Sequence, residues 1–190
     1  MNSAAYSIET RAPTVASIVF ADDSLNVAGP SSLVTITFSE AVTGFTVGDI
    51  SAPNGALSTF DGTGTTYTVT FTATATTEAA SNSFQVGTGY VDAAGNSGSV
   101  GSSAYSIDTK APSVASIVFA DDSLNIAGPS SLVTVTFSEA VTGFTVGDIS
   151  APNGALSTFD GAGTTYTVTF TATCQYRSGQ QQLPSWLWLR

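Results

Sequence analysis

The sequence predicts an all-β fold made of tandem antiparallel β-sandwiches, the second of which is truncated. Residues 4–74 recur as residues 103–173, and 64 of the 71 aligned positions are identical. Charged residues make up only 9% of the chain, whereas threonine, serine, valine and glycine are abundant, which favours strands over helices. Short apolar runs with a period of two are separated by Gly, Pro, Asn and Asp.

The repeat period is that of a whole domain. An offset of 99 residues exceeds the roughly 20–50 residues of solenoid and propeller units, so each copy is expected to have its own core. The predicted boundaries are 1–9 for the end of a preceding repeat or linker, 10–108 for a complete domain, 109–173 for an incomplete domain and 174–190 for an unrelated tail. The copies differ at Ala4/Ser103, Glu9/Asp108, Arg11/Lys110, Thr14/Ser113, Val27/Ile126, Ile36/Val135 and Thr63/Ala162.

The first half of the repeat shows two strands. Residues 15–20 form an apolar run after Pro13, whose fixed φ and missing N–H suit the start of a strand. Residues 22–26 read as a turn. Residues 34–38 alternate apolar and polar side chains, which predicts a half-buried strand with one face toward the core.

The middle of the repeat predicts a bend, a hairpin and the clearest strand. Residues 47–50 form a short strand, and Asn54-Gly55 is a strong signal for a two-residue hairpin. Residues 61–64 predict a turn. Residues 66–73 then alternate threonine with larger apolar residues, so their apolar side chains are expected to face inward.

The end of the repeat adds further short strands. Residues 84–86, 90–91 and 100–107 are strand-like, and residues 92–96 predict a tight turn. About seven short strands per hundred residues is typical of an antiparallel sandwich of immunoglobulin type. No helix longer than one turn is expected.

The second copy stops matching after Thr173. The counterparts of residues 75–107 are missing, so the second sandwich is predicted to lack its last two strands and to be marginally stable alone. Residues 174–190 hold both tryptophans and the only cysteine, Cys174, which indicates a frame shift or a foreign tail; a genuine capping segment is the alternative.

Composition restricts the function. Fourteen carboxylates precede residue 173, where Arg11 and Lys110 are the only basic residues, so nucleic acid and membrane insertion are not expected. The negative charge is then expected either to bind divalent cations or to keep the chain soluble. The chain has no histidine and only one cysteine, so it lacks the residues of most catalytic and zinc sites. No enzyme is predicted. Because residues 3–9 match residues 102–108, the end of the first repeat, we expect the chain to lie inside a longer array, and the missing signal-peptide pattern at Met1 then carries little information.

Several motifs in a fixed order resemble a known family. They are the run from Val34 to Phe45, Gly48-Asp49-Ile50, Asn54-Gly55, the run from Val91 to Asn96 and the linker from Tyr105 to Pro112. Together they resemble the bacterial immunoglobulin-like repeats of very large surface adhesins and biofilm-associated proteins. The resemblance covers residues 4–173. It implies an extracellular, cell-surface stalk module that spaces an adhesive tip from the cell, often stiffened by Ca²⁺ where domains meet.

The candidate calcium ligands are acidic residues predicted to gather at the ends of the sandwiches. Ca²⁺ takes about six to eight oxygen ligands, which loop carboxylates and linker carbonyls can supply. Asp108, Glu139 and Asp148, with the opposing Asp22 and Asp23, are the predicted ligands at the interdomain seam. Glu9, Glu40, Asp49, Asp92 and Asn96 are the predicted ligands at the N-terminal pole of the first domain.

Alternatives remain open at this point. Acidic residues in turns often bond neighbouring N–H groups and solvate the surface. The expected partners are neighbouring repeats, with surface glycans or host receptors reached through parts outside this chain. A carbohydrate- or receptor-binding immunoglobulin-like module is the alternative function. Near-identical copies with short loops favour the spacer, because recognition loops are expected to differ between copies.

Overall fold

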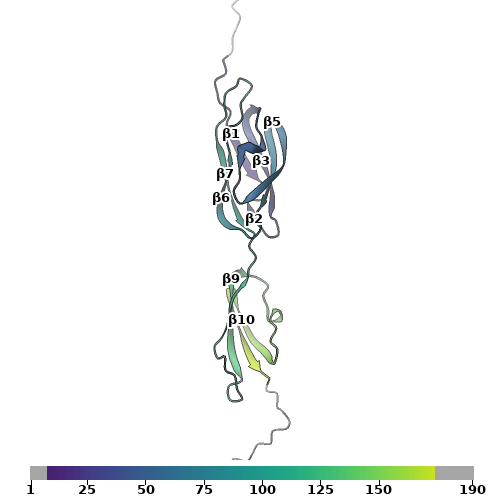
Figure 1. Cartoon of the computed structure of the whole chain (residues 1–190), viewed down its shortest axis with the longest axis vertical. Helices are drawn as coiled ribbons and strands as arrows, with labels where there is room; N and C mark the ends of the chain where they lie inside the picture. Colours follow the sequence, from purple (N-terminus) through teal and green to yellow (C-terminus); the bar gives the residue numbers. More distant parts are fainter. Residues whose placement is uncertain (1–7, 174–190) are drawn as a thin grey trace, which may run out of the picture. The chain divides into compact units, whose positions relative to one another are not determined.

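The computed structural model describes residues 8–173. The chain divides into two compact units between Ala111 and Pro112 (Figure 1). Unit 1 is the complete copy of the repeat, and unit 2 is the shorter one.

Unit 1 is a sandwich of two sheets. Its strands are β1 (Val15–Phe20), β2 (Ser24–Asn26), β3 (Ser31–Val42), β4 (Ile50–Ser51), β5 (Gly55–Ala73), β6 (Glu78–Val86) and β7 (Gly101–Asp108), and η1 (Val47–Asp49) is a 3-10 helix. One sheet has the order β1-β3-β5 and the other β2-β7-β6-β4. These pairings are antiparallel except that of β2 with β7, which is parallel. The predicted all-β sandwich is confirmed.

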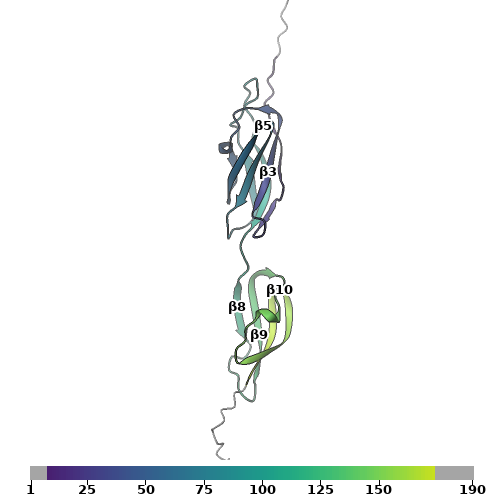
Figure 2. The same cartoon turned by 90° about the vertical axis from the view of Figure 1, so that its right-hand side faces the viewer.

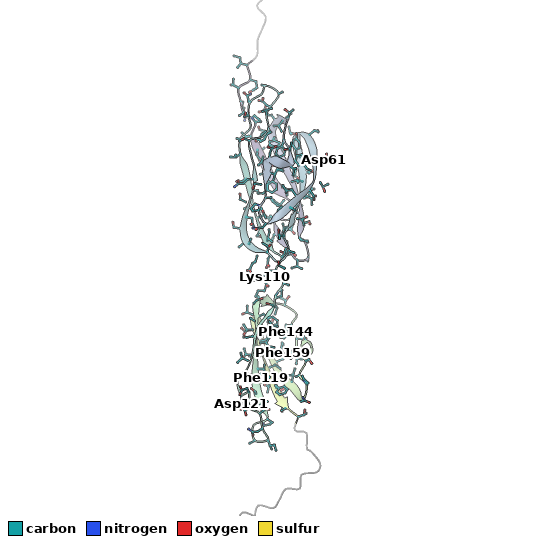
Figure 3. All side chains as sticks on the ribbon, in the orientation of Figure 1. Asp61, Lys110, Phe119, Asp121, Phe144 and Phe159 are labelled. Carbon is teal, nitrogen blue, oxygen red and sulfur yellow. The ribbon has the colours of Figure 1, made fainter. Side chains whose placement is uncertain are left out.

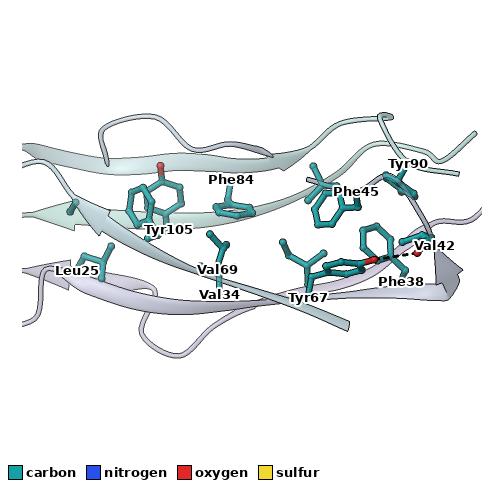
Figure 4. Packing of buried hydrophobic residues seen from close by; sticks show 14 of the residues in the cluster. Leu25, Val34, Phe38, Val42, Phe45, Tyr67, Val69, Phe84, Tyr90 and Tyr105 are labelled. Carbon is teal, nitrogen blue, oxygen red and sulfur yellow. Dashed lines mark hydrogen bonds between the residues drawn. The ribbon is translucent and has the colours of Figure 1, made fainter. Parts of the chain in front are cut away.

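The alternating residues of β3 and β5 form one wall of the core. Val34, Ile36 and Phe38 are buried, as the period of two predicts, and they belong to one core cluster with buried side chains of β6 and β7. Val34 and Phe38 are labelled in Figure 4. The hydroxyl of Tyr67 on β5 donates a hydrogen bond to the carbonyl of Val42 at 3.2 Å, so this buried polar group is satisfied.

Two predicted turns have a different role in the structure. Residues 22–26 contain β2, whose Ser24 lies opposite Ser106 of β7. Asn54-Gly55 is a turn, with Asn54 at φ 62°, but the predicted hairpin is wrong. Because β4 and β5 belong to different sheets, this turn passes the chain from one sheet to the other.

The predicted turn at residues 61–64 is also wrong. These residues lie inside the long strand β5, which bends where Thr59, Gly62 and Gly64 take φ values of 52°, 128° and 67°. Irregular residues of this kind bend a strand without ending it.

Unit 2 repeats one sheet of the sandwich. Its elements are β8 (Val114–Phe119), β9 (Ser130–Val141), η2 (Val146–Asp148) and β10 (Gly154–Ala172), with sheet order β10-β9-β8 (Figure 2). The register is retained, since Val135 lies opposite Tyr166 as Ile36 lies opposite Tyr67.

The described part of unit 2, residues 112–173, has no second sheet. The sequence predicts the loss of the last two strands, but the counterparts of β2 and β4 are not strands either. The reason is that β2 pairs with β7 and β4 with β6, so they have no partner when those strands are missing. Leu25 is buried in unit 1, whereas its counterpart Leu124 is half-buried. Within residues 112–173, the second copy therefore forms one sheet only.

Candidate functional site

The chain leaves unit 1 at the end where β7 stops, which we call the exit pole. Asp108, the last residue of β7, lies opposite Asn26 of β2 and opposite Glu78 of β6. Like charges on opposite residues of neighbouring strands repel. Lys110 forms an exposed ion pair with Glu78 at 3.5 Å, which offsets part of this repulsion.

Thr109 fixes the path of the chain beyond β7. Its buried hydroxyl donates to the carbonyl of Thr74 at 2.7 Å and accepts from the N–H of Thr77 at 3.0 Å. Its backbone N–H donates to the carbonyl of Thr77 at 2.8 Å, and its carbonyl accepts from the N–H of Thr76 at 3.2 Å. The turn between β5 and β6 therefore holds the start of the linker.

Asp22 and Asp23 lie at the same exit pole, before β2. Asp22 accepts a hydrogen bond from the N–H of Ser24 at 2.9 Å through its carboxylate. The carbonyl of Asp23 accepts from the N–H of Ser106 on β7 at 2.8 Å. Asp22 therefore shapes the turn, and Asp23 joins the turn to β7.

The chain enters unit 1 at the opposite end, the entry pole, where residues 92–96 form a loop. Asp92 is only 4% exposed, and its Oδ1 accepts from the N–H groups of Ala94 at 2.9 Å and Asn96 at 2.8 Å. Its Oδ2 accepts from Nδ2 of Asn96 at 2.7 Å. The same amide lies 3.4 Å from the carbonyls of Glu9 and Arg11. The loop thus holds the chain where it enters unit 1, and Thr109 holds the chain where it leaves unit 1.

These hydrogen bonds set the charge state of Asp92. The bond from the Asn96 side chain lowers the pKa of Asp92 most, burial opposes it, and the bonds from backbone N–H groups lower it further. A carboxylate whose pKa is lower in the folded than in the unfolded state stabilises the fold above its ordinary pKa of 3.8. That contribution is lost as the pH falls through the lower, folded value.

We therefore predict that the stability of unit 1 falls below about pH 4 and that Asp92→Asn removes part of this dependence. The measurement is hydrogen exchange of unit 1 amides in wild type and variant between about pH 3 and 6, corrected for intrinsic exchange. The matched control is the exposed Asp61→Asn, which should keep the wild-type dependence. An Asp92→Asn profile parallel to that of wild type would contradict the assignment.

The other candidates of the entry pole are placed as follows. Glu9 accepts from the N–H of Arg11 at 2.7 Å through Oε1. Asp49 accepts from the N–H of Thr46 at 2.8 Å and from its hydroxyl at 3.0 Å, which caps η1. Glu40 is half-buried on β3. The described contacts bring Glu9, Asp92 and Asn96 together, whereas Asp49 closes a turn of its own.

Unit 2 repeats part of this arrangement. Asp148 accepts from the N–H and the hydroxyl of Thr145, both at 2.9 Å, and these bonds lower the pKa of Asp148 against the opposing effect of burial. Glu139 is half-buried on β9. The match between the copies ends at Thr173, before the position equivalent to Asp92.

Among residues 8–173, no group of three or more Asp, Glu, Cys or His side chains is close enough to hold a metal ion. The predicted ligands at the seam come from both units, and calcium binding there stays a prediction. Sequence reasoning missed Glu78, the residue opposite Asp108. Its position depends on the register of β6 against β7, which a single sequence does not contain.

The fold and its repetition define the chain as tandem immunoglobulin-like β-sandwich domains. The family model for the bacterial Ig-like domain matches residues 9–107 and again residues 108–184. The chain therefore belongs to the bacterial Ig-like domain family, whose members are typically non-enzymatic. A comparison with curated proteins gives no match. No helix within the described range is both long and apolar enough to cross a membrane.

Proposed function

We propose that this chain is a stretch of spacer domains from the stalk of a secreted or surface-anchored bacterial adhesin. The observation that supports the proposal is the path of the chain through unit 1. The Cβ position of Gly101, at the start of β7, lies against Val15 at the start of β1, and both strands then run toward the exit pole. The chain thus enters at one end of the sandwich and leaves at the other (Figure 1). Each added domain of this kind lengthens the chain.

The anchoring of both linkers supports the same function. Asn96 holds the entering chain and Thr109 holds the leaving chain, so a pull on the termini is transmitted to β1 and β7. These strands lie in different sheets and share the core between them. Extension requires this core to shear, which suits a load-bearing spacer.

The surface of unit 1 favours a spacer over a binding module. From Ile8 to Ala111, every phenylalanine and tyrosine is buried or half-buried. Binding surfaces for sugars and proteins rely on accessible aromatic side chains. Two hollows of this unit, of about 340 and 280 Å³, are lined mainly by Ser, Ala and Gly. A glycan that binds this chain would favour the carbohydrate-binding alternative.

Calcium at the domain junction is the second part of the proposal. The ligands would be Asp108, Glu139, Asp148, Asp22 and Asp23 at the seam, with Glu9, Glu40, Asp49, Asp92 and Asn96 at the entry pole. The repulsion between Asp108 and Glu78 gives a cation a reason to bind near the exit pole. A flexible cage of carboxylate and carbonyl oxygens suits Ca²⁺ better than Mg²⁺.

The test is thermal unfolding of the chain with calcium and with a chelator. At a calcium concentration about 100 times the dissociation constant, stabilisation amounts to about 2.7 kcal/mol, which raises the midpoint by several degrees. The double variant Asp108→Ala/Glu139→Ala should lose this shift, and the control Asp61→Ala, on β5, should keep it. If the midpoint does not move at about 1 mM calcium, the range of weak extracellular sites, the cation part of the proposal is wrong.

A further inference from the structure

Unit 2 contains an apolar cleft of about 430 Å³. One wall is the face of the β8-β9-β10 sheet, with Ile117, Phe119 and Phe170, and the other is formed by Phe144 and residues 148–152. Phe119 and Phe144 are labelled in Figure 3. The first wall is the sheet face that β1, β3 and β5 bury in unit 1.

Unit 1 shows what occupies this place in a complete domain. There β6 and β7 cover the same face with four buried hydrophobic side chains, Phe84, Val86, Tyr105 and Ile107. Phe84 and Tyr105 are labelled in Figure 4. Among the residues that line the cleft, only Val135 differs from its counterpart, Ile36. The cleft therefore matches this pair of strands in shape and chemistry.

The polar contacts of β6 and β7 also have their counterparts in unit 2. Asn54 donates to Oδ1 of Asn82 at 2.7 Å, and the hydroxyl of Tyr105 donates to the carbonyl of Pro53. The residues equivalent to Asn54 and Pro53 are Asn153 and Pro152, and Asn153 keeps a φ of 65° against 62° in unit 1. Unit 2 therefore keeps the amide donor of Asn153 and the carbonyl acceptor of Pro152, and Pro152 lines the cleft.

The second wall also offers backbone groups that pair with a strand in unit 1. In unit 1 the N–H of Gly87 donates to the carbonyl of Asp49 at 2.8 Å, and Ile50 lies opposite Val86 of β6. The equivalent residues in unit 2 are Asp148 and Ile149. Within residues 112–173 neither residue is paired in a strand. Their backbone can form the same pairing, which is the basis of recognition by strand addition.

This wall has the same local structure in both units. The helix η2 is capped by Asp148 and Thr145 as η1 is capped by Asp49 and Thr46. A preorganised acceptor pays little conformational entropy when a strand binds. The cleft is thus ready to receive a strand pair.

We propose that the cleft of unit 2 is an acceptor site for a β6–β7 strand pair with the sequence of residues 78–108, supplied by another polypeptide of this repeat type. A strand pair that already packs in its own complete unit gains no stability by moving to the cleft of unit 2. The donor is therefore a fragment in which these residues stand without their own β1-β3-β5 sheet. This proposal is independent of the spacer function.

The chain's own tail is a poor substitute for β6. At the repeat offset of 99, Pro184 stands where unit 1 has Gln85. Gln85 lies opposite Ser51 on one side and Ser102 on the other, so its strand is paired on both sides. Proline has no N–H and is disfavoured in such a position.

Two neighbouring residues of β8 provide a matched test. Val118 is 56% exposed, as is its counterpart Val19 in the complete unit, so it lies on the solvent face in both. Ile117 is 60% exposed and lines the cleft, whereas its counterpart Ile18 packs against the core. A lysine at either position should be tolerated by the fold, but only one of them faces the proposed ligand.

The experiment adds a fluorescently labelled synthetic peptide of residues 75–108 to the full chain and follows its anisotropy. We expect saturable binding of one peptide per chain, weakened about tenfold or more by Ile117→Lys and unchanged by Val118→Lys. Hydrogen exchange should show new protection at residues 148–150. A peptide with Phe84→Asp and Tyr105→Asp should not bind.

Three results would overturn the proposal. They are no binding of the wild-type peptide, equal binding by both lysine variants, and a dimer of the chain in sedimentation whose formation prevents peptide binding. Hydrogen exchange of β9 and β10 in each variant shows that unit 2 is folded, so a loss of binding by Ile117→Lys reports on the cleft.

Discussion

Phe71→Ala is expected to lower the free energy of unfolding of unit 1 by about 3–5 kcal/mol, the range for truncating a buried phenylalanine. The side chain is 0% exposed and meets Tyr105 edge to face, with ring centroids 4.9 Å apart. Because the ring is packed between the two sheets of the sandwich, the cavity that its removal leaves cannot collapse fully.

The matched substitution Phe170→Ala in unit 2 is expected to cost clearly less. Phe170 is half-buried and retains a ring contact with Phe119 at 5.9 Å, but the described part of unit 2 has no counterpart of Tyr105 to pack on it. Phe170 buries less apolar area than Phe71, so its truncation loses less hydrophobic stabilisation.

Hydrogen exchange at increasing urea concentrations separates the two units, since the amides of each report its own opening. The same measurement shows whether unit 2 opens at lower urea than unit 1, as its uncovered face predicts. Equal losses from Phe71→Ala and Phe170→Ala would mean that the face of unit 2 is as well covered as that of unit 1.

Gly62→Ala is expected to destabilise unit 1 by about 3 kcal/mol or more, through backbone strain and a steric clash. Gly62 has a φ of 128°, and a Cβ there would lie 2.4 Å from the carbonyl oxygen of Thr66 and 2.6 Å from Cα of Tyr67. Both are backbone atoms of the strand that carries the core, so neither can move without displacing β5.

Gly64→Ala is the matched control two residues away. Gly64 has a φ of 67° and open space around the position of a Cβ. Its substitution should cost only about 1 kcal/mol, the usual penalty for a left-handed residue with a side chain. Urea titrations of both variants make the comparison. Similar losses at the two positions would show that φ alone, without the clash, sets the cost.

The parts of the fold that depend on local pattern were predictable. The alternation at residues 34–38 and 66–73 predicts which side chains enter the core, because successive side chains of a strand point to opposite faces. The strands at residues 15–20 and 100–107 follow from their β-branched and apolar runs, with a shift of one residue at β7. In each case the information lies within a few neighbouring residues.

The errors arose where distant residues decide the structure. The turn at Asn54-Gly55 has the local form of a hairpin turn, yet the strands on either side pair with different partners. Residues 24–26 become a strand only because β7 lies beside them. Pairing between residues that are far apart in the chain leaves no periodic signal in a single sequence.

The candidate site shows the same division. The sequence indicated that Asp92 and Asn96 form a tight loop at the entry pole, because an Asp at this position bonds the N–H groups that follow it. It did not indicate that Asn96 reaches the carbonyls of Glu9 and Arg11, or that Thr109 is bound by the turn after β5. These contacts bring together segments more than thirty residues apart.

From the sequence by itself come the tandem repeat, the all-β class and the place where the second copy stops, because identity at a constant offset and a period of two need no knowledge of contacts. Only the tertiary structure decides what the truncation removes. Because β2 depends on β7 and β4 on β6, the loss of two strands leaves the described part of unit 2 with one sheet and an open apolar cleft. A sheet is held together by hydrogen bonds between strands, so removing a strand also removes the structure of its neighbours.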